Sequence, residues 1–173
     1  MNGRAAGSAL PAFFHARRSR GYLSLATVTA LLGFAAVVNL PKQPVIGLVL
    51  VAVTAYMAAL TLCFPLMRYV VSDSVLSAEY GPVLRWRIPL AEVSNVSRVR
   101  LAPSFFVALV MPGIALYGMR SAGHGRVRMC ATKTITGVYL VETRNGTRYG
   151  FTPADEQAFE AALRRRGIRV TGR

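Results

Sequence analysis

Acidic residues are absent from the first part of the chain, where Asp73 is the first Asp or Glu. Between residues 21 and 67 the only charged side chain is Lys42. Charged residues make up 16% of the whole sequence, against roughly 25% in an average soluble domain. So long a stretch with almost no charge is unlike a soluble domain and is typical of a membrane protein.

Residues that carry chemistry are scarce as well, with two histidines and two cysteines in the chain. His15 lies in the N-terminal segment and His124 in a glycine-rich turn, and neither belongs to a recognisable catalytic motif. Cys63 and Cys130 are far apart and lack the spacing of metal ligands or of a disulfide framework. We therefore expect no catalytic residue, no cofactor and no metal site, and a protein that is not an enzyme.

Two long apolar runs cover residues 21–40 and 45–67. The hydrocarbon core of a bilayer is about 30 Å thick and a helix rises about 1.5 Å per residue, so about 20 residues suffice to cross it. The link between the runs, Pro41-Lys42-Gln43-Pro44, is so short that the two helices must be antiparallel neighbours. The pattern predicts a basic N-terminal tail at residues 1–20 and a transmembrane helical hairpin at residues 21–67, integral to the lipid bilayer.

Positive charge flanks the outer ends of this hairpin. Arg17, Arg18 and Arg20 precede the first run and Arg68 follows the second, whereas the link carries only Lys42. The positive-inside rule then predicts a multi-pass protein of the plasma (inner) membrane with a cytoplasmic N-terminus and a cytoplasmic C-terminal domain. A cleaved signal peptide or a twin-arginine export signal is the alternative, but the first run has no A-x-A cleavage site and a second run follows at once.

The residue pattern changes at residue 68, from where short apolar runs separated by turn residues indicate β structure. Asn145-Gly146 is the strongest hairpin signal in the chain. A closing amphipathic helix should begin with Thr152 as its N-cap and Pro153 at its first position, and end at Gly167. The expected strands lie near residues 68–71, 75–80, 83–88, 94–101, 115–119, 126–131, 137–143 and 147–151.

Three segments of this C-terminal part resemble the bacterial pleckstrin-homology (PH) domain proteins. They are the stretch IPLAEV at residues 88–93, the hairpin TGVYLVETRNGTRYGF at 136–151 and the segment TPAD at 152–155 that opens the closing helix. The resemblance implies an α+β membrane protein, in which the two-helix transmembrane hairpin precedes a PH-like β-barrel or sandwich at residues 68–173. It further implies about seven strands in two roughly orthogonal antiparallel sheets, a capping C-terminal α-helix and no catalytic residues.

The formal net charge is +14, and part of it is arranged in three Arg-x-Arg triplets. Alternate side chains of a strand point to opposite faces, so each triplet should expose two arginines and bury the residue between them. If the three strands are neighbours, six guanidinium groups share one face that could bind anionic phospholipids or a membrane protein partner. The alternative is that they are only the solvated positions of amphipathic strands. The candidate lipid-binding or ligand-binding residues are Arg85, Arg87, Arg98, Arg100, Arg126 and Arg128.

The sequence thus predicts a membrane-anchored, non-catalytic binding or scaffold protein, with a membrane-associated nucleic-acid-binding protein as the alternative. Nucleic acid is the less favoured partner because Trp86 is the only aromatic candidate for base stacking and its strand phase points it inward. The acidic turn Ser72-Asp73-Ser74 argues against specific phosphoinositide recognition. The apolar segment 103–117 is either a buried strand and loop or a loop that enters the bilayer with Phe105 and Phe106. The sequence leaves the oligomeric state open.

Overall fold

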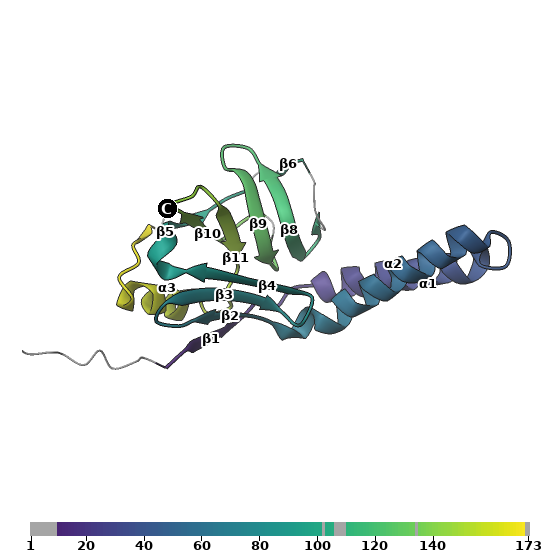
Figure 1. Ribbon diagram of the computed structural model, residues 1–173, viewed down its shortest axis with the longest axis horizontal. Helices are drawn as coiled ribbons and strands as arrows, with labels where there is room; N and C mark the ends of the chain where they lie inside the picture. Colours follow the sequence, from purple (N-terminus) through teal and green to yellow (C-terminus); the bar gives the residue numbers. More distant parts are fainter. Residues whose placement is uncertain (1–9, 102, 106–109, 134, 172–173) are drawn as a thin grey trace, which may run out of the picture.

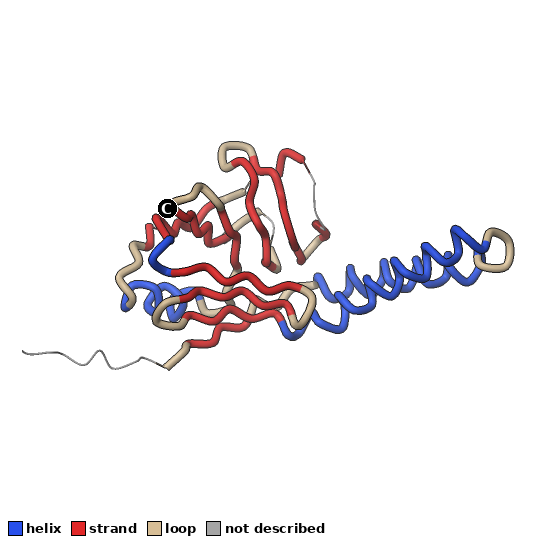
Figure 2. Tube along the Cα trace, in the orientation of Figure 1, coloured by secondary structure: helices blue, strands red, loops and turns tan. Residues whose placement is uncertain are grey.

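The computed structural model describes residues 10–101, 103–105, 110–133 and 135–171. Two long helices lie side by side and project from a β-rich body, and a shorter helix packs at the far side of that body (Figure 1). Figure 2 shows the same separation, with the strands gathered at one end and the long helices at the other. The expected α+β organisation, with two apolar helices followed by a sheet domain and a closing helix, is confirmed.

The long helices are α1, Gly21–Asn39, and α2, Pro44–Cys63, and the short 3-10 helix η1, Phe64–Leu66, continues α2. Pro44 occupies the first turn of α2, where its missing N–H costs nothing. The helices are antiparallel, and the hydroxyls of Thr29 and Thr61 are hydrogen-bonded at 3.2 Å across their interface. Both helices are long and apolar enough to cross a membrane, by length and composition.

The two ends of the helix pair differ in exposure. Next to the β-rich body, Leu25, Met57 and Leu60 are buried. Further along both helices, toward the turn that joins them, many large apolar side chains are exposed. They include Leu31, Phe34, Val37, Val45, Leu48 and Val49. A core helix of a soluble protein buries its apolar side chains, so this surface is unlike one.

The first sheet has the order β1-β2-β3-β4 and is antiparallel throughout. Its strands are β1, Ala12–His15; β2, Met67–Val71; β3, Val75–Tyr80; and β4, Leu84–Pro89. The sequence did not predict β1, which pairs along β2 from within the segment expected to be a tail.

The second sheet has the order β12-β5-β10-β11-β9-β8-β6, and β7 pairs with β8. Two of its pairs, β11 with β9 and β12 with β5, are parallel, so the expectation of purely antiparallel sheets is wrong. All eight expected strands are present to within about two residues. The bounds are β5, Val93–Val99; β6, Pro103–Phe105; β7, Val110–Met111; β8, Ile114–Ser121; β9, Gly125–Ala131; β10, Val138–Thr143; β11, Arg148–Phe151; and β12, Val170–Thr171.

The two sheets do not close into a barrel, so of the two forms expected, barrel or sandwich, the barrel is wrong. β4 ends at Pro89, which has no N–H for a further ladder bond. The 3-10 turn η2, Leu90–Glu92, then carries the chain into the second sheet. There the free edge of β5 pairs with β12 from the C-terminus, so that it is not available to β4. The order of the strands leaves β4 at the edge of its sheet.

The main core lies between the two sheets and the closing helix α3, Glu156–Arg165. Phe159 of α3 is fully buried against the rings of Tyr69 and Tyr139. The expectation that Thr152 caps this helix is wrong. Asp155 is the N-cap, and its carboxylate accepts a hydrogen bond from the amide of Ala158 at 2.9 Å.

Thr152 has a different role because it directly follows β11, before the chain reaches α3. It is buried, and its hydroxyl accepts from the amide of Thr132 at 2.8 Å. At the other end of α3, the expected stop at Gly167 is confirmed by its φ of 76°.

A second apolar cluster covers the other face of the eight-stranded sheet. Met129 and Val138 approach Gly150 so closely that a Cβ there would lie 2.4 Å from the Met129 sulfur and 3.2 Å from Val138 Cγ1. A glycine in the middle of β11 therefore makes room for the side chains of both neighbouring strands.

The helix pair is docked on the body through close backbone contacts. A Cβ on Gly21 would lie 2.3 Å from the carbonyl oxygen of Gly113, in the turn between β7 and β8. Ser19 donates a hydrogen bond to the same oxygen at 2.5 Å. Tyr80 of β3 donates to the carbonyl of Leu60 in α2, also at 2.5 Å. The helices and the body thus share a packed junction rather than a free linker.

The apolar segment 103–117 contributes β6, β7 and the first half of β8. Ile114 and Leu116 are buried in the main core, and Tyr117 is hydrogen-bonded to Tyr56 of α2. Its C-terminal part therefore agrees with the buried reading. Phe106 lies outside the described residues, and the side chain of Phe105 is not described, so the bilayer reading of that part stays a prediction.

Candidate functional site

The three Arg-x-Arg triplets lie on three separated strands. Arg85 and Arg87 are on β4 of the first sheet, Arg98 and Arg100 are at the end of β5, and Arg126 and Arg128 are on β9. All six side chains are exposed. However, β4 belongs to a different sheet, and β10 and β11 separate β5 from β9. A shared face of six arginines is therefore not formed.

The alternation within each triplet is as expected. Val127 is fully buried, and Trp86 and Val99 are half-buried and pack against the two cores. The indole of Trp86 meets the ring of Tyr149 edge-on, with 5.7 Å between ring centroids. Trp86 is thus held against the core side of its strand by this contact, in line with the predicted inward phase.

Two of the six arginines are engaged in ion pairs. Arg85 lies 2.8 Å from Glu79, and Arg98 lies 2.9 Å from Glu156 of α3. Glu79 also accepts a hydrogen bond from Arg68 at 2.8 Å. This bond and the charges of both guanidinium groups hold the pKa of the Glu79 carboxyl below its ordinary value, against the opposing effect of its burial.

Arg126 and Arg128 form a cluster with a third arginine, Arg120. Arg120 and Arg126 are direct cross-strand partners in the β8–β9 hairpin, and Arg128 lies two residues further on the same face. We call these three residues the hairpin patch. Arg120 was not among the predicted residues because it is not part of a triplet, although its place just before the turn at residues 122–124 mirrors that of Arg126 just after it.

Neighbouring residues fit the side chains of the hairpin patch. Gly118 leaves room for Arg126, whose Nε would lie 3.3 Å from a Cβ at that position. The guanidinium of Arg128 lies over the ring of Tyr149, 5.6 Å from its centroid, and donates to its hydroxyl at 3.3 Å. These contacts orient the two arginines without neutralising them.

No carboxylate lies within 4 Å of the three guanidinium groups among the residues that the structure describes. A shallow cavity of about 220 Å³ adjoins the patch, and Arg126, Arg128, Asn145, Gly146 and Thr147 line it. Uncompensated guanidinium groups next to the hydroxyl of Thr147 suit a phosphate or carboxylate.

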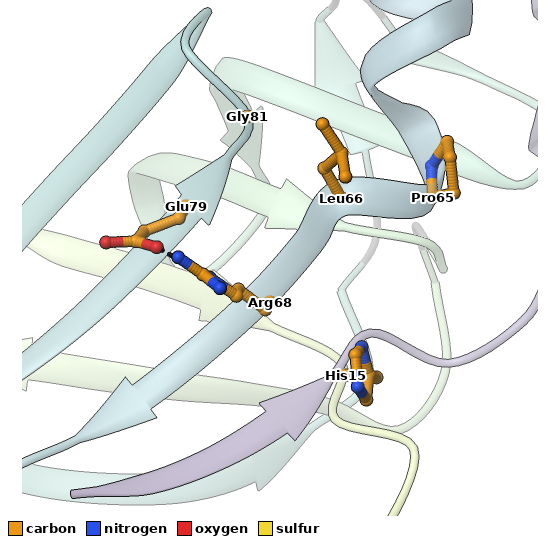
Figure 3. Close-up of a pocket in the computed structure, with 6 residues that line it drawn as sticks. All are labelled: His15, Pro65, Leu66, Arg68, Glu79 and Gly81. Carbon is orange, nitrogen blue, oxygen red and sulfur yellow. Dashed lines mark hydrogen bonds and ion pairs between the residues drawn. The ribbon is translucent and has the colours of Figure 1, made fainter.

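A second polar site lies where the first sheet meets the helix pair. In Figure 3, Arg68 of β2 points toward Glu79 of β3, and His15 lies on the adjoining strand β1. The cavity here has a volume of about 270 Å³ and is bounded on its helix side by Pro65 and Leu66. It therefore combines charged and apolar walls at the base of the helices.

Side chains that could support redox or metal chemistry are not grouped. No cluster of three or more His, Cys, Asp or Glu residues suited to a metal occurs among the described residues. Both cysteines are free and buried, and burial raises the pKa of the Cys130 thiol to about 12, so it stays protonated at physiological pH.

The fold defines a class of protein in which two apolar helices precede two packed sheets and a closing helix. A family model described as bacterial PH domain matches residues 67–167. This match covers more than half of the chain, so the chain belongs to the bacterial PH domain family, as the sequence resemblance indicated. Comparisons with curated proteins and with solved structures gave no match.

Proposed function

We propose that this protein is a membrane-anchored, non-catalytic binding module that holds its PH domain against the cytoplasmic face of the plasma membrane. The observation that carries the proposal is the apolar surface of the helix pair, which is exposed on side chains such as Phe34, Val37 and Leu48. Exposing so many large apolar side chains to water is unfavourable by roughly 25 cal/mol per Å². A bilayer removes that penalty.

The charges around the helix pair support the cytoplasmic placement of the body. Arg18, Arg20 and Arg68 are exposed at the base of the helices, whereas the far turn carries Lys42 alone. Basic residues are retained on the cytoplasmic side of membrane helices. The N-terminal strand and the PH domain then lie on the same side, which agrees with the pairing of β1 with β2.

The junction between helices and body gives the hairpin patch a fixed relation to the membrane. β8 begins after Gly113, which contacts the first turn of α1. It then runs across the direction of the helices, on the side of the body that lies nearest to them (Figure 1). If the helices cross the bilayer, β8 and β9 lie beside its surface. Each arginine there contributes on the order of 1 kcal/mol to the free energy of binding to an anionic leaflet. Anionic phospholipid is therefore the proposed ligand.

Membrane anchoring is tested by alkaline carbonate washing of membranes that contain the full chain. The protein should remain in the pellet and be released only by detergent. Its orientation is tested with Gln43→Cys and Ala122→Cys on the native background, since Cys63 and Cys130 are buried. A membrane-impermeant maleimide should label residue 43 in intact cells and residue 122 only after lysis. Release by carbonate, or the reverse labelling, would refute the proposal.

Lipid binding is tested on the full chain in nanodiscs, by hydrogen exchange of the β8–β9 hairpin. Exchange should be slower in discs with phosphatidylglycerol than in pure phosphatidylcholine, and 0.5 M salt should remove the difference, because the Debye length falls to a few ångströms. Arg126→Gln/Arg128→Gln should also remove it. Arg144→Gln, which removes an exposed arginine at the β10–β11 turn, is the matched control. Equal exchange in the two lipids would exclude the hairpin patch as a binding site for anionic phospholipid.

A further inference from the structure

The end of β1 and the linker that follows it are fixed to the body by three backbone hydrogen bonds. The amide of Ala16 donates to the carbonyl of Met67 at 3.1 Å, and the amide of Arg17 donates to the carbonyl of Thr152 at 3.0 Å. The carbonyl of His15 accepts from the amide of Ala154 at 2.9 Å. The side chains of the linker therefore project from defined positions at the base of the helix pair.

A cavity of about 480 Å³ lies beside this linker, and it contains cationic side chains on one wall. Its described lining residues are His15, Ala16, Arg17, Arg18, Phe64, Pro65, Met67, Thr132 and Ala154, with no Asp or Glu among them. Arg17 is paired with Glu156 at 3.3 Å, but its side chain is 47% exposed, and such pairs are weak. Arg18 has no carboxylate within 4 Å among the described residues.

The opposite wall is apolar and leads onto the surface of the helices. Phe64 and Pro65 belong to η1, where α2 enters the body. The side chains of Leu66, in the same 3-10 helix, and of Leu62, near the end of α2, are exposed at 54% and 76% of their area. An apolar strip therefore runs from the cavity along α2, in the direction of the proposed membrane. A ligand that fills both parts needs an anionic head and a long apolar tail.

We infer that this cavity binds the headgroup of an anionic phospholipid from the adjoining leaflet, with its phosphate at Arg17 and Arg18 and its acyl chains along Pro65, Leu66 and Leu62. The inference rests on the proposed membrane anchoring, which brings such lipids to the base of the helices. The smaller cavity in Figure 3 shares His15 and Pro65 with this one. Glu79 lines that smaller cavity, so the anionic headgroup is assigned to the larger one.

Lipid retention by the full chain measures this site directly. The detergent-purified protein is mixed with dioleoylphosphatidylglycerol or dioleoylphosphatidylcholine, and bound lipid is counted by native mass spectrometry. The wild type should retain one phosphatidylglycerol in preference to phosphatidylcholine. Arg18→Gln should weaken that binding about fivefold, as expected for the loss of one arginine near an anionic lipid.

A second variant blocks the cavity without changing its charge. Ala154→Phe, at an exposed position on the rim, should also reduce phosphatidylglycerol retention, while its thermal unfolding should match that of the wild type. Arg144→Gln should retain lipid as the wild type does, because it removes an arginine that lines none of these cavities.

Two outcomes would overturn the inference while leaving the anchoring intact. One is equal retention of both lipids, or no effect of either Arg18→Gln or Ala154→Phe, in a protein that resists carbonate extraction. The other is competition by glycerol 3-phosphate as effective as that by the lipid, which would assign the cavity to a free phosphate. Failure of the anchoring itself would be seen separately, as release of the chain by carbonate.

Discussion

The hydroxyl of Tyr69 donates a hydrogen bond to the carbonyl of Cys130 at 2.7 Å and thereby joins the first sheet to the second. The same hydroxyl accepts from the amide of Thr152 at 3.2 Å. Tyr69 is fully buried, and this burial raises the pKa of its hydroxyl, which stays protonated and able to donate. One phenol therefore satisfies two backbone groups that have no access to water.

Tyr69→Phe should destabilise the fold, because it leaves the Cys130 carbonyl and the Thr152 amide without this partner. The expected loss is about 1–3 kcal/mol in the free energy of unfolding. Tyr139→Phe is the matched control, since its hydroxyl donates to the carboxylate of Glu160, which water can reach. Urea unfolding of both variants in the same detergent checks this, and an equal loss in the two would contradict the role assigned to Tyr69.

Gly150 and Met129 should show coupled effects on stability. Gly150→Ala places a methyl group 2.4 Å from the Met129 sulfur, and overpacking of this kind costs about 1–3 kcal/mol. Met129→Ala costs about 2–5 kcal/mol through the cavity it leaves. In the double variant the new methyl group enters that cavity, so the combined loss should be smaller than the sum. Strict additivity in a double-mutant cycle would show that the two residues do not compete for space.

The elements that the sequence predicted are those specified by local patterns. The two helices follow from apolar length and the prolines between them, and the eight predicted strands, of four to eight residues, follow from alternation and turn residues such as Asn145-Gly146. The strands that were missed, β1, β6, β7 and β12, have two to four residues each. A segment so short becomes a strand only because a partner strand offers it an edge.

The candidate site was predictable in its chemistry but not in its arrangement. The alternation of polar and apolar residues correctly predicted that Arg126 is exposed and that Val127 is buried. Sheet order depends on long-range pairing, and nothing near the three triplets indicates that β10 and β11 lie between β5 and β9. For the same reason, the sequence did not bring Arg18 to Phe64 and Thr132. Arg120 is close to Arg126 in the sequence as well as in the hairpin, and it was missed only because it lies outside the triplets.

Glu79 should stabilise the first sheet only above acidic pH. Its pKa is lower in the folded protein than in the unfolded chain, chiefly through the hydrogen bond from Arg68. Its contribution is therefore fully present above the unfolded value of about 4.3 and is lost as the pH falls through the folded value. Glu79→Gln should cost about 1–2 kcal/mol at pH 7, a modest figure because Arg68 and Arg85 are half-exposed.

The pH dependence separates this ion-pair effect from a packing effect. The difference in unfolding free energy between wild type and Glu79→Gln should be constant from pH 7 to about pH 5 and shrink below about 4.3. Glu92→Gln removes an exposed carboxylate that has no ion pair among the described residues, and its stability should match the wild type throughout. A Glu79→Gln difference that persists unchanged at pH 3 would mean that the charge is not its source.

The junction between the helix pair and the body should depend on two glycines in contact. Gly113 has a φ of 87°, which favours glycine, and its carbonyl lies where a Cβ of Gly21 would be. Gly21→Ala must therefore move α1 away from the β7–β8 turn and weaken the hydrogen bond from Ser19. Gly33→Ala is the matched control on the same helix, since its methyl group would meet only Thr54 Cγ2, at an ordinary 3.5 Å.

Trypsin cleavage after Arg20 reports on this junction, because Arg20 is exposed and directly precedes Gly21. A local loss of about 1.4 kcal/mol in the closed junction corresponds to a tenfold higher population of the open form. Gly21→Ala should thus be cleaved about tenfold faster than the wild type in detergent, and Gly33→Ala at the wild-type rate. Equal cleavage of all three proteins would mean that the helices and the PH domain move independently, and the hairpin patch would then have no fixed orientation toward the bilayer.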